Sequence, residues 1–567
     1  MTTNSQEKAI RAIVVPVTPF QQNCSIVWCL ETSKGAIFDP GGDLDNILKA
    51  VEEHKVSIEK ILITHAHLDH AGGAHELSQI LNVPIEGPHK EDLFLMESLA
   101  EQGEKFGLHG AKVFKTDRYL QNGDITLVIE SLKERGILKR NAPHLVRDLS
   151  FVIPSYDWWS SPFYGIGMKI YDMMAGNLGL GKSIMISKKE TIKLIPNVNK
   201  KGLRGGVIYH DGQFDDSRMA MTLALTADSK KTTLLNYCSV ENLLKDQDEV
   251  IGVKFHDNIN FKKYEARSKV VINATGVFAE DIIRMDQPDI DKMIQPSQGV
   301  HIVLEKKFLK SKHAILIPQT SDGRVLFAVP WKNYVVVGTT DTQVKTASDE
   351  PKPLKDEIEF ILNNASKYMS LKPKMTDIKS VFAGLRPLAA TSNKKSTKEV
   401  SRSHKIDIAP SGLISVLGGK WTTYRKIAED AIDSAISINK LKKKKCKTEK
   451  TKLFGFKKRV EWSDPMHIYG SLKSKVESLG GSTDNTSLSD KIFITNNIIK
   501  WSIIHEMAMT LEDILARRTR CIFLDAKESK RIAPMVAKKM AEILEKDQKW
   551  IDKELKNFNK LIKNYIV

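Results

Sequence analysis

A cluster of metal-ligand residue types lies in the first part of the chain. Three imidazoles and one carboxylate occur within six residues, at His65, His67, Asp69 and His70. Imidazole and carboxylate groups form zinc and iron sites, and an H-x-H-x-D-H cluster can ligate two divalent ions. The apolar run at residues 60–63 predicts a strand that ends just before the cluster. The sequence therefore predicts zinc or iron binding at this strand end.

A glycine turn in the second half of the chain is suited to a different ligand. The stretch Gly418-Gly419-Lys420 follows the apolar run 413–417, which predicts a buried strand, and precedes residues 427–436, whose apolar spacing predicts a helix. Glycines let the backbone approach a ligand closely, and the free N–H groups of a helix start favour an anion or an electron-rich ring edge. Thr422 and its neighbour can cap the helix. The alternative is a purely structural turn.

Polar residues inside other apolar segments provide a base and cations. His301 lies in the apolar run 299–303, and Arg386 lies in an apolar segment that we predict to be a turn. An imidazole can accept a proton, and a guanidinium fork such as that of Arg386 or Arg402 suits a phosphate. The alternatives are a hydrogen-bonded core histidine and ordinary surface ion pairs. A second glycine turn follows an apolar strand and consists of Asn273, Ala274, Thr275 and Gly276.

At these residues the chain resembles the FAD-dependent glycerol-3-phosphate dehydrogenases of the quinone-linked bacterial and mitochondrial kind. The resemblance runs from about Thr126 to near the C-terminus. Further stretches that fit it are residues 211–218, 320–324, 338–342 and 516–520. It implies oxidation of sn-glycerol 3-phosphate to dihydroxyacetone phosphate with FAD as cofactor and a quinone as electron acceptor.

The same resemblance implies roles for individual residues. His301, Arg386 and Lys420 are the implied catalytic residues, and Arg386, Arg402 and Lys420 are the implied substrate ligands. The implied flavin-binding residues are Asn273, Ala274, Thr275, Gly276, Gly418, Gly419, Lys420 and Thr422. Oxidation of a secondary alcohol needs a base for the hydroxyl proton, and a cation near the flavin stabilises its reduced, anionic form.

Residues from about 10 to 124 resemble the N-terminal half of a metallo-β-lactamase superfamily hydrolase, close to the glyoxalase II-like enzymes. The resemblance includes Asp39-Pro40-Gly41-Gly42 and the histidine cluster. That family adds two further histidines and a bridging aspartate in the second half of an αββα sandwich, and nothing of that type follows residue 124. The cluster is therefore half of a binuclear site. A metal-dependent thioester or lactone hydrolase is the alternative function, and a non-catalytic fusion remnant is a third.

The flavin-related part also departs from its family pattern at its start. Such a domain begins with a strand, G-x-G-x-x-G, a helix and an acidic residue about 20 positions further on, and no such stretch precedes residue 126. The letters G-x-x-x-x-G-K-S at residues 176–183 are not a P-loop, because the segment before them is helix-like. We therefore expect two truncated genes joined near residues 124–126, with weak or absent FAD binding.

The expected architecture is multidomain, α/β and α+β. Residues 1–124 form a truncated metallo-β-lactamase half-sandwich. Residues 125–440 form an incomplete FAD-binding α/β domain, into which the sheet of a β-rich substrate domain is inserted at about 299–382. Residues 441–460 are a lysine-rich linker, and residues 461–567 form a C-terminal helical domain, with amphipathic helices at 496–515 and 530–565.

Composition limits the remaining function classes. The 567 residues are 41% hydrophobic, which suits a globular chain of several domains. No apolar run approaches the ~18–20 residues of a membrane span, and five scattered cysteines favour reduced thiols in a cytoplasm. The net charge of +17 comes without a nucleic-acid-binding signature, so we expect no nucleic acid partner. The lysines are densest at residues 440–459, which suits a solvated linker or peripheral contact with the anionic inner face of the cell membrane.

Overall fold

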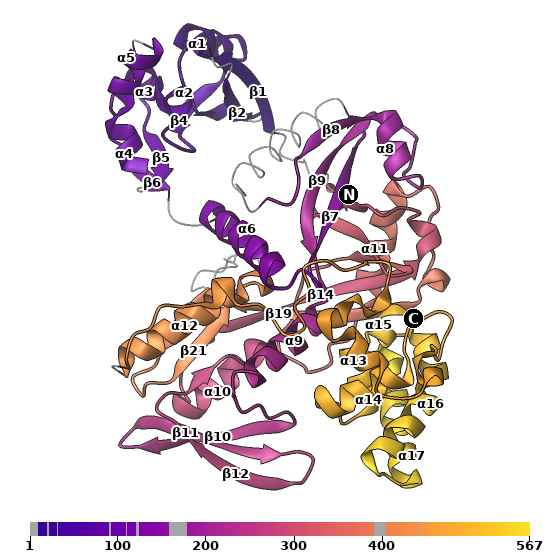
Figure 1. Cartoon of the computed structure of the whole chain (residues 1–567). Coiled ribbons are helices and arrows are strands. Elements are labelled where there is room, and N and C mark those ends of the chain that lie inside the picture. Colours follow the sequence, from indigo (N-terminus) through magenta and orange to yellow (C-terminus); the bar gives the residue numbers. More distant parts are fainter. Residues whose placement is uncertain are drawn as a thin grey trace, which may run out of the picture. The chain divides into compact units, whose positions relative to one another are not determined.

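A computed structural model describes residues 10–19, 22–30, 32–89, 92–108, 110–120, 124–157, 179–390, 404–439 and 441–567. The chain divides into two compact units, Met1–Thr126 and Leu127–Val567, which are described separately (Figure 1). Within the described residues, every helix is too short or too polar to cross a membrane.

The first unit is built on one six-stranded sheet in the order β1-β2-β3-β4-β5-β6. Strands β1 to β3 are antiparallel, and β3 to β6 run parallel. The strands are β1 (Ile10–Val17), β2 (Gln22–Cys29), β3 (Lys34–Phe38), β4 (Ser57–Leu62), β5 (Ile85–His89) and β6 (Arg118–Leu120). The helices are α1 (Leu44–Glu53), α2 (Leu68–Ala71), α3 (Ala74–Leu81), α4 (Leu93–Glu97) and α5 (Leu99–Phe106).

The helices of this unit cover one face of its sheet. Ile26 and Ile37 of the strands pack with Ile47 of α1 and Leu77 of α3, and all four are fully buried. The opposite face is far less covered, since Val14 of β1 is 54% exposed. Alternate residues of a strand point to opposite faces, so this pattern follows directly from the sequence period.

The second unit contains a large mixed sheet, in the order β18-β14-β17-β16-β15-β7-β9-β8, with β19 also paired to β14. Its strands are β7 (Arg147–Ser155), β8 (Ile184–Ser187), β9 (Gly205–Gln213), β14 (Ile294–Glu305), β15 (Ala314–Ile317), β16 (Leu326–Trp331), β17 (Tyr334–Gly338), β18 (Thr342–Gln343) and β19 (Ser380–Ala389). The sheet therefore extends beyond residues 299–382. Helices α8 (Lys188–Leu194) and α11 (Lys355–Tyr368) belong to the same part of the unit. Val300 and Ile302 of β14 share a buried core with Ile361 of α11.

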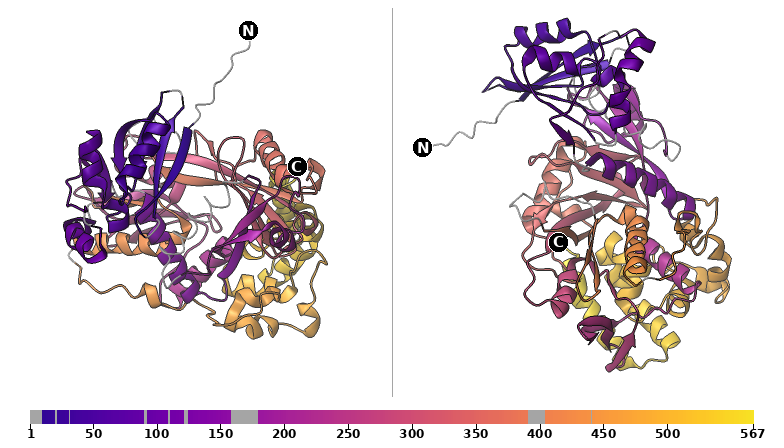
Figure 2. Two further views of the ribbon diagram at one scale, coloured as in Figure 1. Left: turned by 90° about the horizontal axis from the view of Figure 1, so that it is seen from above. Right: turned by 90° about the vertical axis from the view of Figure 1, so that its left-hand side faces the viewer.

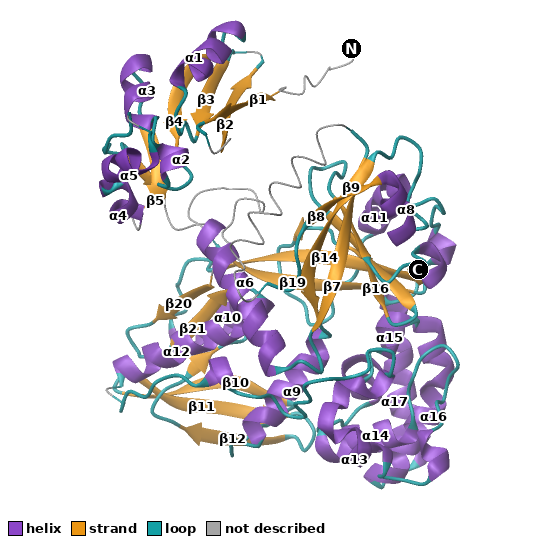
Figure 3. Cartoon of the chain, turned by 45° about the horizontal axis from the view of Figure 1, so that its top comes forward, coloured by secondary structure: helices purple, strands orange, loops and turns teal. Residues whose placement is uncertain are grey.

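Two smaller sheets lie beside the large one (Figure 3). β13 (Ile272–Asn273) runs parallel to β21 (Ile414–Gly418), which pairs antiparallel with β20 (His404–Ile408). β10 (Cys238–Asp246), β11 (Glu249–Asp257) and β12 (Lys262–Arg267) form an antiparallel meander. The accompanying helices are α6 (Asp124–Asn141), α9 (Asp216–Asp228), α10 (Ala279–Asp286) and α12 (Tyr424–Ile438).

The C-terminal part is helical, as the sequence predicts, and is drawn in yellow in Figure 2. Its main helices are α13 (Lys473–Glu477), α14 (Asn496–His505), α15 (Cys521–Leu524), α16 (Ala526–Leu544) and α17 (Gln548–Leu561). The prediction of one helix over residues 496–515 was wrong. The α14 helix ends at His505, because Met507 has a positive φ of 53° that a right-handed helix does not permit, and a π-helical turn, Asp513–Arg518, follows.

A buried ion pair joins this helical part to α9. The Arg218 guanidinium donates to both carboxylate oxygens of Glu506, at 2.9 and 2.6 Å, and the indole of Trp501 donates to the same carboxylate at 2.9 Å. Both charged side chains are almost completely buried. Burial of a charge is tolerated only when it is paired and hydrogen-bonded, as it is here.

Candidate active site

Strands β14 and β19 place the predicted base and the predicted phosphate ligand on one face of the large sheet. In their antiparallel register His301 lies opposite Phe382, and Ser297 lies opposite Arg386. Opposed residues share a face, and residues at even spacing along a strand share it too. His301 and Arg386 therefore face the same side. The prediction that Arg386 lies in a turn was wrong, because β19 continues through it in register with β14.

Glycines on this face leave room around both side chains. A Cβ atom on Gly299 would lie 2.5 Å from the Nη2 atom of Arg386, and a Cβ atom on Gly338 would overlap the imidazole of His301. A Cβ atom on Gly384 would meet no atom within 4 Å. Glycine inside a strand often marks the close approach of a ligand or another backbone. The face is thus open to solvent at Gly384, which lies between the base and the guanidinium in the strand register.

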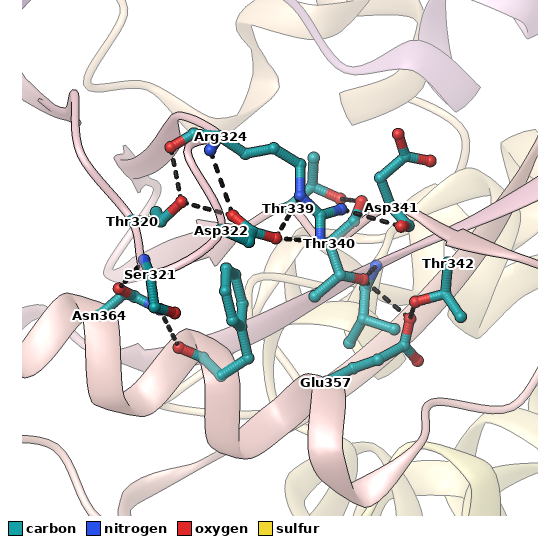
Figure 4. A network of polar contacts seen from close by, with 12 residues as sticks. Thr320, Ser321, Asp322, Arg324, Thr339, Thr340, Asp341, Thr342, Glu357 and Asn364 are labelled. Atoms are coloured by element: carbon teal, nitrogen blue, oxygen red, sulfur yellow. Dashed lines mark hydrogen bonds and ion pairs between the residues drawn. The ribbon is translucent and has the colours of Figure 1, made fainter. Parts of the chain in front are cut away.

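A polar network fixes the position of Arg386, and Figure 4 shows the neighbouring part of that network around Arg324, Asp341 and Glu357. Arg386 Nη2 donates to the Thr339 hydroxyl and to the Thr340 carbonyl, each at 3.2 Å. Arg386 Nη1 lies 3.6 Å from the carboxylate of Asp341. The main-chain carbonyl of Asp341 in turn accepts from Arg324 Nη1 at 2.9 Å. The guanidinium is thereby oriented before any ligand arrives, which reduces the entropic cost of binding.

The buried carboxylate of Glu357 holds the same segment from the other side. It accepts from the hydroxyls of Thr340 and Thr342, at 2.9 and 2.7 Å, and from Gln298 Nε2 at 2.8 Å. Sequence reasoning missed Asp341 and Glu357 as members of the site. The signal for Asp341 was present in the stretch 338–342, whereas nothing in the local sequence singles out Glu357.

His301 is an uncharged imidazole on this face. Burial, and to a lesser degree the positive charge of Arg386, lower its pKa to about 4. The imidazole is therefore neutral at physiological pH and has a free lone pair for a proton. It stacks on Phe382, with 5.2 Å between ring centroids, and Phe382 packs against Phe523 of the C-terminal helices at 5.0 Å.

The Gly418-Gly419-Lys420 turn lies at the end of β21, as the sequence predicts. Gly418 and Gly419 have φ values of 71° and 94°, in the left-handed region that favours glycine. Lys420 Nζ lies 3.5 Å from the Ser131 hydroxyl of α6. The predicted threonine cap is absent: Thr422 lies in a short 3₁₀ turn, and the following threonine donates its hydroxyl back to the Lys420 carbonyl.

The second predicted turn follows β13. Asn273 is buried; its amide donates to the Ala279 carbonyl at 2.9 Å, and its side-chain oxygen accepts from the Thr275 hydroxyl at 2.7 Å. Ala274 is exposed, and Gly276, with a φ of 62°, has no atom within 4 Å of a Cβ position. β19 contacts both this turn and β21, so the strand that carries Arg386 lies close to both glycine turns. Arg402 lies outside the described residues.

The predicted metal ligands are gathered in the first unit. The His65 ring centroid lies 4.7 Å from that of His67 and 4.0 Å from that of His70. His70 Nδ1 lies 3.1 Å from Asp39, while Asp69 lies 3.7 Å from the other nitrogen of His70. Burial and the two neighbouring imidazoles lower the pKa of His65. Among the described residues, however, no group of three ligating side chains has the geometry of a metal site.

Comparison with known proteins assigns the fold to a class. Residues 102–425, more than half of the chain, match the family described as FAD dependent oxidoreductase, and the chain belongs to this family. Residues 415–551 match the C-terminal domain of alpha-glycerophosphate oxidase, and residues 17–146 match the metallo-beta-lactamase superfamily.

The similar relatives are glycerol-3-phosphate dehydrogenases. The mitochondrial protein of Mesocricetus auratus is 35% identical over 467 residues, which cover 76% of this chain and 64% of the relative. The mitochondrial protein of Arabidopsis thaliana is 34% identical over 472 residues, covering 76% and 74%. The chain thus spans about two thirds of the length of the mammalian relatives. The FAD-complexed glycerol-3-phosphate dehydrogenase of Bacillus halodurans shares the fold, with 23% identity, a TM-score of 0.63, and coverage of 90% of this chain and 95% of that one.

The described residues fit one end of an FAD molecule. A dinucleotide of this kind needs room for its ring and a glycine-rich strand–turn–helix for its diphosphate. The open face at Gly384 and the turn at Lys420 leave room for the ring. Among the described residues β13 is a two-residue strand at the edge of its sheet, and the 567-residue sequence contains no G-x-G-x-x-G for the diphosphate end.

Proposed function

We propose that the second unit oxidises sn-glycerol 3-phosphate to dihydroxyacetone phosphate when its FAD site is completed. The observation that carries this proposal is the single sheet face on which His301 and Arg386 lie on either side of the open position at Gly384. The names of the relatives support the choice of substrate.

Each residue has a defined task in this proposal. The neutral imidazole of His301 takes the proton of the secondary hydroxyl. The guanidinium of Arg386, already oriented by Thr339 and Asp341, binds the phosphate, with Arg402 and Lys420 as further cations. FAD, when bound, supplies the acceptor for the hydride. Asn273 to Gly276, Gly418, Gly419 and Thr422 line its site.

We also propose the electron acceptor and the place of action. A quinone receives the electrons, and the protein works at the inner face of the cell membrane, without a nucleic acid partner. The run of exposed lysines at 442–445 supports attraction to an anionic surface.

The chain itself is proposed to be a fusion of two truncated genes joined near residues 124–126. Its proposed domains are residues 1–124, 125–440 and 461–567, with 441–460 as linker.

A hydrolase reaction in the first unit is the second candidate function. The match to the metallo-beta-lactamase superfamily and the three clustered imidazoles favour it. Zinc or iron at His65, His67, Asp69 and His70 would supply an activated water. We propose that this half-site binds metal weakly, because a hydrolytic zinc site needs three well-placed protein ligands in addition to its open position.

Substrate binding tests the dehydrogenase proposal without the need for turnover. Because Arg386 is already oriented by its neighbours, glycerol 3-phosphate should bind to the full chain in calorimetry more tightly than glycerol. Arg386→Gln should weaken that binding by about 1.5–3 kcal/mol, the usual value of a hydrogen bond to a charged group. Equal binding of glycerol and glycerol 3-phosphate, unaffected by Arg386→Gln, would refute the assignment.

A further inference from the structure

The small mixed sheet β13-β21-β20 ends at β13, beside which no further strand lies in the described residues. β13 pairs with β21 on one side, and within the described parts of the chain its other side has no strand. Parallel strands occur almost only in buried sheets with further strands beside them. Val271 and Ile272 at this edge are apolar and only half-buried. This edge thus has the properties of an interior strand that lacks a neighbour.

The direction of the free main-chain groups can be derived from the pairing. The carbonyl of Val271 accepts from the Ile414 N–H at 3.1 Å, so Val271 hydrogen-bonds toward β21. Main-chain groups alternate between the two sides of a strand. The N–H and C=O of Ile272 therefore face the open edge, where an added parallel strand would bond to them.

The turn beyond β13 is already formed. Asn273 holds it through hydrogen bonds to Thr275 and Ala279, and Gly276 leaves space above it. A parallel strand added at the open edge would end beside this turn, since parallel strands end on the same side of a sheet. A glycine turn and helix start at that point would provide the N–H groups that bind a diphosphate.

We propose that the outer edge of β13 binds, in trans, a strand–G-x-G-x-x-G–helix segment of a second polypeptide, which completes the FAD site. The proposal rests on the dehydrogenase function proposed above. A second copy of this chain does not fit as the partner, because the sequence contains no such glycine pattern. The partner is thus the start of an FAD-binding domain.

The experiment mixes the full chain, FAD and a strand–G-x-G-x-x-G–helix polypeptide cut from an FAD-binding member of the same family. Size-exclusion chromatography with flavin absorbance should give a 1:1 complex that retains one FAD, whereas the chain alone retains none. Ile272→Pro removes the outward N–H but leaves the pairing with β21, and proline is tolerated at such edge positions. It should raise the dissociation constant of the complex by at least about tenfold.

Ile272→Val is the matched control, because it keeps the N–H and the apolar character. Both variants should unfold at the same temperature as the parent chain. Retention of FAD by the chain alone, absence of a complex, or equal binding by Ile272→Pro would each overturn the proposal. A complex that holds FAD but does not oxidise glycerol 3-phosphate would support this inference and refute the proposed reaction instead.

Discussion

Replacing Glu506 by glutamine should loosen the attachment of the C-terminal helices to α9. The carboxylate accepts two hydrogen bonds from Arg218 and one from Trp501. An amide has one oxygen, so its NH₂ group would face at least one of these donors. The Arg218 charge would remain buried and lose its hydrogen-bonded counter-charge, with the carboxylate of Asp215 as the remaining nearby anion. Breaking a buried pair by removing one partner costs about 3–5 kcal/mol.

Amide hydrogen exchange shows which part of the chain loses stability in Glu506→Gln. Exchange of α9 and α14 amides by local opening should accelerate by about two to four orders of magnitude in Glu506→Gln, from 1.36 kcal/mol per tenfold. The matched control is Glu265→Gln, which breaks the Lys254–Glu265 pair, whose side chains are 51% and 49% exposed. That change should cost less than about 1 kcal/mol. Similar small effects in both variants would refute the argument that burial gives the first pair its importance.

Three further predictions concern the two units. Gly338→Ala should displace His301 and reduce turnover of the completed enzyme by more than tenfold, whereas Gly481→Ala in the C-terminal part, whose Cβ would meet the Thr483 hydroxyl at an ordinary 3.9 Å, should change it little. Steady-state assays that find the two variants equal would contradict the geometry. In the folded protein the pKa of His301 is lowered to about 4, below the ordinary value of about 6.5. The contribution of His301 to the free energy of unfolding is therefore fully present above pH 6.5, and it is lost as the pH falls from about 6.5 toward 4, because the unfolded state binds the proton first. His301→Phe should flatten this part of the pH–stability profile in urea unfolding, and parallel profiles would contradict it. Elemental analysis of the purified chain should find less than one zinc or iron per molecule, and two bound ions lost in His67→Ala would instead favour the hydrolase.

Short-range patterns in the sequence were enough to identify many elements. The apolar runs at residues 314–317 and 334–337 coincide with β15 and most of β17, because short apolar runs rich in β-branched residues favour a buried strand. The glycine turns after β13 and β21 were also predictable, since few residues other than glycine adopt φ values such as the 94° of Gly419.

Tertiary structure decided how these elements form a site. His301 and Arg386 are 85 positions apart in the sequence. The local pattern predicts a strand at His301 and a turn at Arg386. The register of β14 with β19 alone puts them on one face. Glu357 and Glu506 are ordinary carboxylates in the sequence, and only burial beside Thr340 or Arg218 gives them a role. Local sequence limits backbone conformation, whereas pairing register and burial depend on contacts between distant segments, which no local pattern contains.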